Sequence, residues 1–201
     1  EFTNYHLIPM VSAIWSMPPY EANKMPLKFF LKFFQNHGLF KLKDRPQWYT
    51  VTNRSRTYVN KILNKISGEV FKNYQVSKIV RSENNVRVSI GNEYLDYDHV
   101  VLASHADQSL KMIKDPTEEE KEILTKFSYV SNSAYLHKDK NLMPKRKSAW
   151  SSWNSITKEN KTCVTYWLNK LQNLKTEKDY FLTLNPVEKI NEENIIKKVN
   201  F

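Results

Sequence analysis

The residues best suited to chemistry are five histidines, one cysteine and a polar stretch at 104–108. No two histidines stand at the i, i+4 spacing that places two metal ligands on one helix face. The pattern closest to a ligand pair is His105-x-Asp107, and a single cysteine excludes a multi-thiolate zinc site. We therefore predict that the chain holds no metal.

Nucleophilic catalysis also lacks its usual sequence pattern. Ser104 and His105 are adjacent, but no glycine beside them permits the strained G-x-S-x-G turn of a serine hydrolase. Cys163 stands in an apolar, strand-like stretch without a neighbouring base, which indicates a structural thiol. Because one cysteine cannot form an internal disulfide, the composition favours a reducing compartment, and we predict a cytoplasmic protein.

The chain has three glycines, Gly38, Gly68 and Gly91, and they lie far apart in the sequence. Loops that bind phosphate need glycines a few residues apart, so that backbone N–H groups can approach the phosphate without a side chain between them. These residues can therefore form neither a P-loop nor the G-x-G-x-x-G turn of a dinucleotide site.

The formal net charge is +10, from 31 basic and 21 acidic residues. Only six basic residues are arginine, the side chain that contacts guanine or phosphate in two places at once, and the lysines are spread along the chain. We predict no specific nucleic-acid site, and favour an anionic substrate or peripheral contact with a membrane surface. No apolar run approaches the ~18 residues of a membrane-spanning helix.

The elements that must position these side chains fall into three stretches. Residues 1–50 predict a short buried helix ending near Trp15, and a second helix that begins at Pro26 and ends at a left-handed Gly38. The second helix has Phe29, Phe30, Phe33 and Phe34 at helical spacing, which is typical of a face packed on a core or of a pocket wall.

In residues 51–110 the spacing of the hydrophobic residues changes from helical to alternating. A helical face around Tyr58 is followed by the alternating stretches Val76–Arg81 and Val86–Ile90, which predict a small antiparallel meander. The run Val100–Ala103 is continuously apolar and predicts a strand buried on both faces of a sheet. Polar residues 104–108 would then stand at the carboxyl end of that strand, where open α/β sheets bind ligands.

Residues 111–201 open with a helix, since Thr117 and Glu120 form a capping box. Four aromatic or β-branched stretches then predict a mixed sheet packed with helices, at 128–136, 149–154, 163–168 and 180–185. The whole chain is thus predicted to be α/β, with helices and strands mixed as in α+β folds.

Eight short strings follow in order along nearly the whole chain. They are PMVSAIWS at 9–16, NHGL at 36–39, RPQWYTV at 45–51, SRTYV at 55–59, HADQ at 105–108, LMPKR at 142–146, WSSWN at 150–154 and VTYWLNKLQ at 164–172. Together they resemble the flavin-containing amine oxidase-like superfamily of NAD/FAD-binding proteins.

The resemblance implies part of a two-domain FAD-dependent oxidoreductase that takes a hydride from a substrate carbon. Residues 51–110 would belong to the FAD-binding domain, and residues 1–50 and 111–201 to the substrate domain. The family's N-terminal G-x-G-x-x-G and its C-terminal flavin segment do not occur here, so we expect the middle fragment of a longer protein. The resemblance places FAD against Val76, Ala103, Ser104 and His105, although Val76 and Ala103 suit an ordinary strand core equally well.

The resemblance also departs from the monoamine-oxidase pattern in an informative way. Such relatives place a lysine near the start of the strand that matches 129–136, where this chain has Ser131-Asn132-Ser133. Oxidation of an amine is therefore not favoured, and we expect an apolar, lipid-like substrate. His105 and Asn132 are the candidate catalytic groups, although His105 also suits a helix cap. The candidate pocket residues, each of which also suits a core, are Phe29, Phe33, Trp150, Trp153 and Tyr166.

Two alternatives remain open. The chain could be a lipid or small-molecule binding module without catalysis, derived from such an enzyme. It could also use its lysines and aromatic side chains to bind single-stranded nucleic acid, in which case affinity would fall steeply with salt.

Overall fold

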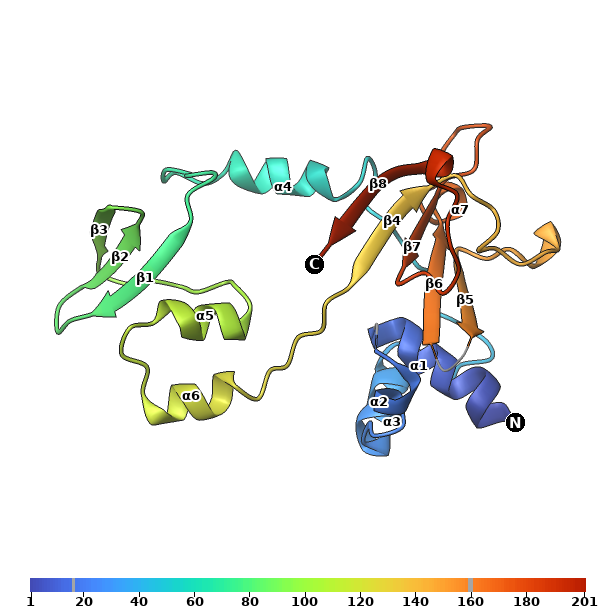
Figure 1. Ribbon diagram of the computed structural model, residues 1–201, viewed down its shortest axis with the longest axis horizontal. Helices are drawn as coiled ribbons and strands as arrows, with labels where there is room; N and C mark the ends of the chain where they lie inside the picture. The colour runs from blue at the N-terminus through green and yellow to red at the C-terminus, as the bar shows by residue number, and fades with distance from the viewer. Residues whose placement is uncertain (16, 159–160) are drawn as a thin grey trace. The chain divides into compact units, whose positions relative to one another are not determined.

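The structure, a computed structural model, describes residues 1–15, 17–158 and 161–201 (Figure 1). The chain divides into two compact units. Unit 1 comprises Glu1–Asn60 and Ser131–Phe201, and unit 2 comprises Lys61–Val130. The described residues form seven α-helices and two antiparallel sheets, which confirms the mixed α/β class. The assignment of 1–50, 51–110 and 111–201 to cofactor and substrate domains stays a prediction.

Unit 2 contains the predicted meander. Its three antiparallel strands pair in the order β1-β2-β3 (Figure 1). A turn closed by Ser82 N–H donating to the Asn85 carbonyl joins the first two strands, and Gly91, at φ +60°, opens the second turn. Ile79 and Val88 face each other across the pair and form its small core. The strands are β1 (Val76–Arg81), β2 (Val86–Ile90) and β3 (Glu93–Tyr97).

The predicted buried strand at Val100–Ala103 is wrong. The segment has no regular structure, and Val101 is 90% exposed. A strand buried on both faces needs hydrogen-bonded neighbours and a cover on each face. Within the described residues, no strand pairs with this segment, so its apolar side chains have no sheet to join. Ser104 and His105 therefore do not stand at the end of a buried strand.

Two short helices complete unit 2, α5 (Ala106–Met112) and α6 (Glu118–Leu124). The predicted capping box of α6 is confirmed, because the Thr117 hydroxyl accepts from Glu120 N–H and the Glu120 carboxylate accepts from Thr117 N–H. That carboxylate also accepts two hydrogen bonds from Arg81, at 2.7 and 3.0 Å, which ties α6 to β1.

In unit 1 the N-terminal helices follow the predicted pattern. The chain enters helix at a π-helical turn, Thr3–Leu7, and continues as α1 (Ile8–Trp15). Helix α3 (Leu27–Asn36) starts after Pro26 and ends as predicted at Gly38, whose φ is +64°. Of its four phenylalanines, only Phe34 is buried, so the aromatic face is covered in part. Helix α2 (Pro19–Ala22) also belongs to this unit, and α4 (Ser55–Leu63) crosses the boundary between the units, which falls after Asn60.

The C-terminal part of unit 1 is a five-stranded sheet in the order β5-β6-β7-β4-β8. All four pairings are antiparallel, so the mixed sheet that the sequence predicted is instead an antiparallel one. Strands β4, β6 and β7 overlap the predicted stretches 128–136, 163–168 and 180–185, whereas β5 shares only Trp153 and Asn154 with the predicted stretch 149–154, and β8 was not predicted. The strands are β4 (Ser133–His137), β5 (Trp153–Lys158), β6 (Lys161–Trp167), β7 (Phe181–Leu184) and β8 (Ile195–Asn200), and short helical turns lie at Lys147–Ala149, at Leu168–Leu171 (α7) and at Glu192–Asn194.

The core of this sheet combines apolar and polar side chains. Phe181 and Leu142 are fully buried, and Trp150 packs edge-on against Phe181. Beside them runs a fully buried polar chain, in which Thr183 Oγ1 lies 2.7 Å from His137 Nε2 and 2.8 Å from Thr165 Oγ1. Each polar group in the chain has a partner, so its burial does not carry the cost of an unsatisfied group.

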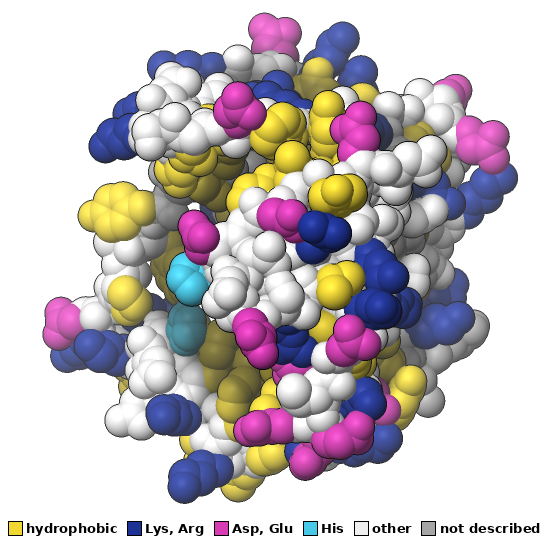
Figure 2. Space-filling model, turned by 90° about the vertical axis from the view of Figure 1, so that its left-hand side faces the viewer, with side chains coloured by type: hydrophobic (Ala, Val, Ile, Leu, Met, Phe, Trp, Pro, Cys, Tyr) yellow, Lys and Arg dark blue, Asp and Glu magenta, His cyan; other side chains and the backbone are white. Residues whose placement is uncertain are grey.

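The surface carries both signs of charge. On the face in Figure 2, acidic and basic side chains are interspersed, and hydrophobic side chains reach the surface between them. Exposed hydrophobic residues of unit 2 include Tyr94, Val101 and Phe127. No helix among the described residues is long and apolar enough to cross a membrane.

Candidate ligand-binding site

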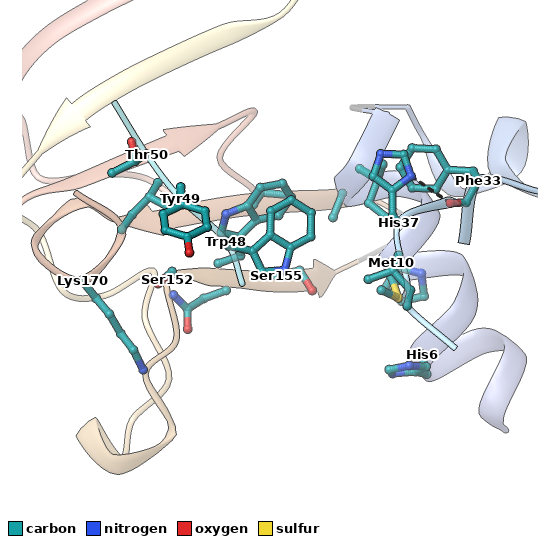
Figure 3. Close-up of a pocket in the computed structure, with 18 of the residues that line it drawn as sticks. His6, Met10, Phe33, His37, Trp48, Tyr49, Thr50, Ser152, Ser155 and Lys170 are labelled. Atoms are coloured by element: carbon teal, nitrogen blue, oxygen red, sulfur yellow. Dashed lines mark hydrogen bonds between the residues drawn. The ribbon is translucent and has the colours of Figure 1, made fainter. Parts of the chain in front are cut away.

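Unit 1 contains a cavity of about 830 Å³ (Figure 3). One wall comes from helices α1 and α3, and the other from strands β5 and β6 and the short helix α7. The extended segment 48–50 contributes three further lining residues. Twelve of the nineteen lining residues are apolar or aromatic, which is typical of a site for an apolar small molecule.

The helical wall is held rigid by aromatic stacking. The Phe33 ring lies 4.6 Å from the Trp15 ring, and the His37 ring stacks on Phe33 at 3.9 Å. His37 Nδ1 lies 2.8 Å from the Phe33 carbonyl oxygen, an acceptor, so Nδ1 carries the proton and donates. Phe33, in the last turn of α3, and His37, the residue that follows the helix, thus fix each other's orientation at the cavity (Figure 3).

The sheet wall begins where β5 begins. Trp153 faces Tyr166 of β6 across the strand pair, with the rings edge to face at 5.1 Å. The next residue, Asn154, is buried, and its side-chain amide bonds to the Ser151 N–H, the Ser151 carbonyl and the Thr165 carbonyl. This clamp holds the turn before β5 and thereby places Trp153 at the cavity.

The segment that carries Trp48, Tyr49 and Thr50 has no regular secondary structure. Trp48 is 69% exposed and Tyr49 is 88% exposed, although both line the cavity (Figure 3). The segment therefore forms the part of the wall that borders solvent. These residues belong to the string RPQWYTV, yet the sequence analysis did not place them in the pocket.

The predicted pocket residues take different positions. Phe33 and Trp153 line the cavity together, from elements about 120 residues apart in the chain. Phe29 is 51% exposed and packs on Trp15 outside the cavity. Trp150 is a core residue whose indole N–H donates to the Pro144 carbonyl. Tyr166 stands behind Trp153, and burial raises the pKa of its hydroxyl.

The predicted FAD contacts all belong to unit 2. Val76 pairs with Ile90 in the meander, and Ala103 and Ser104 are exposed. Ser104 Oγ lies 2.8 Å from Ser109 Oγ of α5. His105 is the residue before α5, and no hydrogen bond from its side chain caps the helix.

The His105 ring stacks on Tyr129 at 4.2 Å, nearly parallel, and the Tyr129 hydroxyl accepts from the Ala106 N–H. Packing around the start of α5 therefore accounts for the position of His105. Its assignment as a catalytic group and as an FAD contact stays a prediction.

Unit 2 does not fit the pyrophosphate of FAD. Its two glycines, Gly68 and Gly91, lie in separate turns, and a Cβ added at either would meet no atom within 4 Å. Neither glycine is therefore needed for a phosphate to approach the backbone closely. Helix α5 is also short, with seven residues.

The other candidate catalytic residue, Asn132, belongs to unit 1. Its backbone exchanges two hydrogen bonds with Phe201, at 2.7 and 2.9 Å, and its side-chain oxygen accepts from Asn185 Nδ2. Asn185 in turn accepts from the Ser133 N–H. These bonds join the start of β4 to β7 and to the end of β8, and the assignment of Asn132 as a catalytic group stays a prediction.

The part of the chain that the structure describes contains neither a cluster of metal ligands nor an accessible thiol. Among those residues, no three His, Cys, Asp or Glu side chains are grouped as metal ligands. Cys163 is 1% exposed, and burial raises the pKa of its thiol, so the thiolate is disfavoured.

Comparison with known proteins gives little. No family model and no curated protein matches the chain. A structural search finds the crystal structure of a CLA-producing fatty acid isomerase from P. acnes, with a TM-score of 0.49 and 13% sequence identity. The match covers 73% of this chain but only 39% of that one. A similarity this low does not identify a family for this chain.

Proposed function

We propose that this chain supplies the substrate-binding part of a flavin-dependent oxidoreductase that acts on an apolar, lipid-like small molecule. The observation that carries the proposal is the cavity of unit 1, of about 830 Å³ and lined mainly by apolar and aromatic side chains. Small-molecule sites typically have volumes of roughly 300–1,000 Å³, apolar walls and a few polar groups that fix orientation.

The chain's own residues would bind, orient and dehydrate the substrate. Phe33 and Trp153 line the cavity from opposite walls, and the clamped Asn154, next to Trp153 in the sequence, lines it too. The redox part of the proposal rests on the order of the family-like strings and on none of these contacts. This chain would therefore supply the substrate cavity. No residue of unit 2 would bind the phosphates of the cofactor.

One observation favours a second function, a binding module without catalysis. The dinucleotide cradle that the redox reaction needs has no counterpart in unit 2. The coding sequence upstream of Glu1 separates the two functions. A strand followed by G-x-G-x-x-G within about two hundred codons supports the oxidoreductase, whereas a start codon directly before Glu1 supports the binding module.

Binding itself can be tested with a neutral, apolar, environment-sensitive dye and with dodecanol as competitor. Phe33→Ala removes a ring from the wall, so we expect dye affinity to fall about tenfold, which corresponds to ~1.4 kcal/mol. Phe29→Ala is the matched control, because Phe29 lies on the same helix outside the cavity. Equal dye affinity in the two variants would remove the cavity as the binding site.

A further inference from the structure

We propose that the cavity of unit 1 takes an amphipathic molecule with one anionic end, and that Lys170 binds that end. This inference rests on the proposed function, since it names the substrate class of the same cavity. It makes Lys170 a specificity-determining residue that the sequence analysis did not single out.

The first observation is the charge pattern of the cavity. Among the described residues that line it, Lys170 is the one lysine or arginine, and no aspartate or glutamate lines it. An acid in the wall would repel an anion, and none is there to do so. The remaining polar groups are neutral hydroxyls and amides and two histidine rings, so Lys170 gives the cavity its positive end.

The second observation is that Lys170 remains available for a ligand. Across residues 1–15, 17–158 and 161–201, no carboxylate forms an ion pair with it. Asp179 is engaged elsewhere, because it accepts from the Trp167 indole at 3.1 Å and pairs with Lys140 at 3.2 Å and Lys147 at 3.8 Å.

The third observation is that the backbone of Lys170 is fixed. It lies in α7, directly after β6, and the Leu168 N–H donates to the Tyr180 carbonyl. The neighbouring Asn169 side chain accepts from the Tyr180 N–H and donates to the Lys178 carbonyl. The helix therefore presents the lysine from a constant position, although its long side chain keeps rotational freedom.

The fourth observation is that the lysine stands at one end of the cavity. In Figure 3, Lys170 lies at the end near Ser152 and Tyr49, whereas Met10 and Phe33 lie at the opposite end together with the rings of His6 and His37. A molecule with its anion at Lys170 would place its apolar body along the aromatic rings toward α1 and α3. A neutral apolar molecule would gain nothing from Lys170.

The test compares dodecanoate with dodecanol, which share a chain and differ in the charge of one end. Both are titrated into the full chain by displacement of the neutral dye. We expect Lys170→Gln to weaken dodecanoate about fivefold, the upper range for a solvent-accessible ion pair, and to leave dodecanol unchanged. Lys170→Arg should retain most of the affinity, and added salt should weaken dodecanoate binding in the unsubstituted chain.

Lys175→Gln is the matched control. It removes the same charge five residues further along the chain, and the Lys175 side chain does not line the cavity. If Lys170→Gln and Lys175→Gln weaken dodecanoate equally, the effect is that of net charge and the role of Lys170 is refuted. If dodecanol and the dye bind but Lys170→Gln leaves dodecanoate unchanged, the cavity stands and the anionic substrate class fails. If no ligand binds, both proposals fail.

Discussion

His137 should make the stability of unit 1 depend on pH. The ring is fully buried, and its Nδ1 accepts from the Asp139 N–H at 3.2 Å. Nε2 therefore carries the proton and donates to Thr183 Oγ1 at 2.7 Å. Burial lowers the pKa of His137, and the charge of Asp139 opposes that shift in part.

The direction of the change in stability with pH follows from how many protons the folded and unfolded states bind. In the unfolded chain His137 takes up a proton near pH 6.5, whereas in the folded chain it stays neutral to a lower pH. The unfolded state therefore binds more protons in the window below pH 6.5, so stability is fully present above that pH and falls as pH falls. One titrating histidine can lower the free energy of unfolding by at most about 1.4 kcal/mol between pH 7.5 and 5.5.

Tryptophan fluorescence is a selective assay for this effect, because all five tryptophans belong to unit 1. Urea unfolding is followed at pH 7.5 and 5.5 in the unsubstituted chain and in His137→Gln, whose amide can still donate to Thr183. We expect the variant to be less stable at both pH values and to lose most of the pH dependence. An equal loss of stability with pH in both chains would refute the reasoning, since the titrating group would then lie elsewhere.

Three further predictions concern the units separately. Thr117→Ala breaks the capping box of α6 and should destabilise unit 2 by about 1 kcal/mol, seen as faster amide hydrogen exchange at 118–121, while Thr117→Ser should not. Gly38→Ala should destabilise unit 1 by about 1 kcal/mol or more in the fluorescence assay, because φ is +64° and the new Cβ would lie 2.9 Å from Pro46 Cδ. The Cys163 thiol should react with a disulfide reagent only as fast as unit 1 opens, and immediate reaction in the folded chain would contradict its burial.

Several elements could be predicted from the sequence because their causes are local. The meander follows from alternation and turn residues, and the capping box of α6 from Thr117 and Glu120 three residues apart. Gly38 ends α3 because a left-handed residue is needed there, and the following Leu39 N–H returns to the Phe34 carbonyl. In each case the interacting groups lie within a few residues of one another.

The predictions that were wrong or missing concern strands, whose formation depends on partners far away in the sequence. The run Val100–Ala103 has the composition of a buried strand, but an apolar pattern does not state which strand will pair with it. Strand β8 (Ile195–Asn200) has two adjacent lysines and no clean alternation, and it forms because β4 offers it a free edge. Both outcomes depend on neighbours that are distant in the sequence.

For the candidate site, too, some residues could be predicted from the sequence and others only from the tertiary structure. The family resemblance and the aromatic side chains made Phe33 and Trp153 pocket candidates, and the apolar stretch around Cys163 identified a structural thiol. The fold decided that Phe33 and Trp153 meet at one cavity while Trp150 enters the core, and that Lys170 stands at the cavity's end. The physical reason is range: turns, caps and amphipathic faces are set by groups a few residues apart, whereas a cavity exists only where helices and strands from both ends of the chain pack against one another.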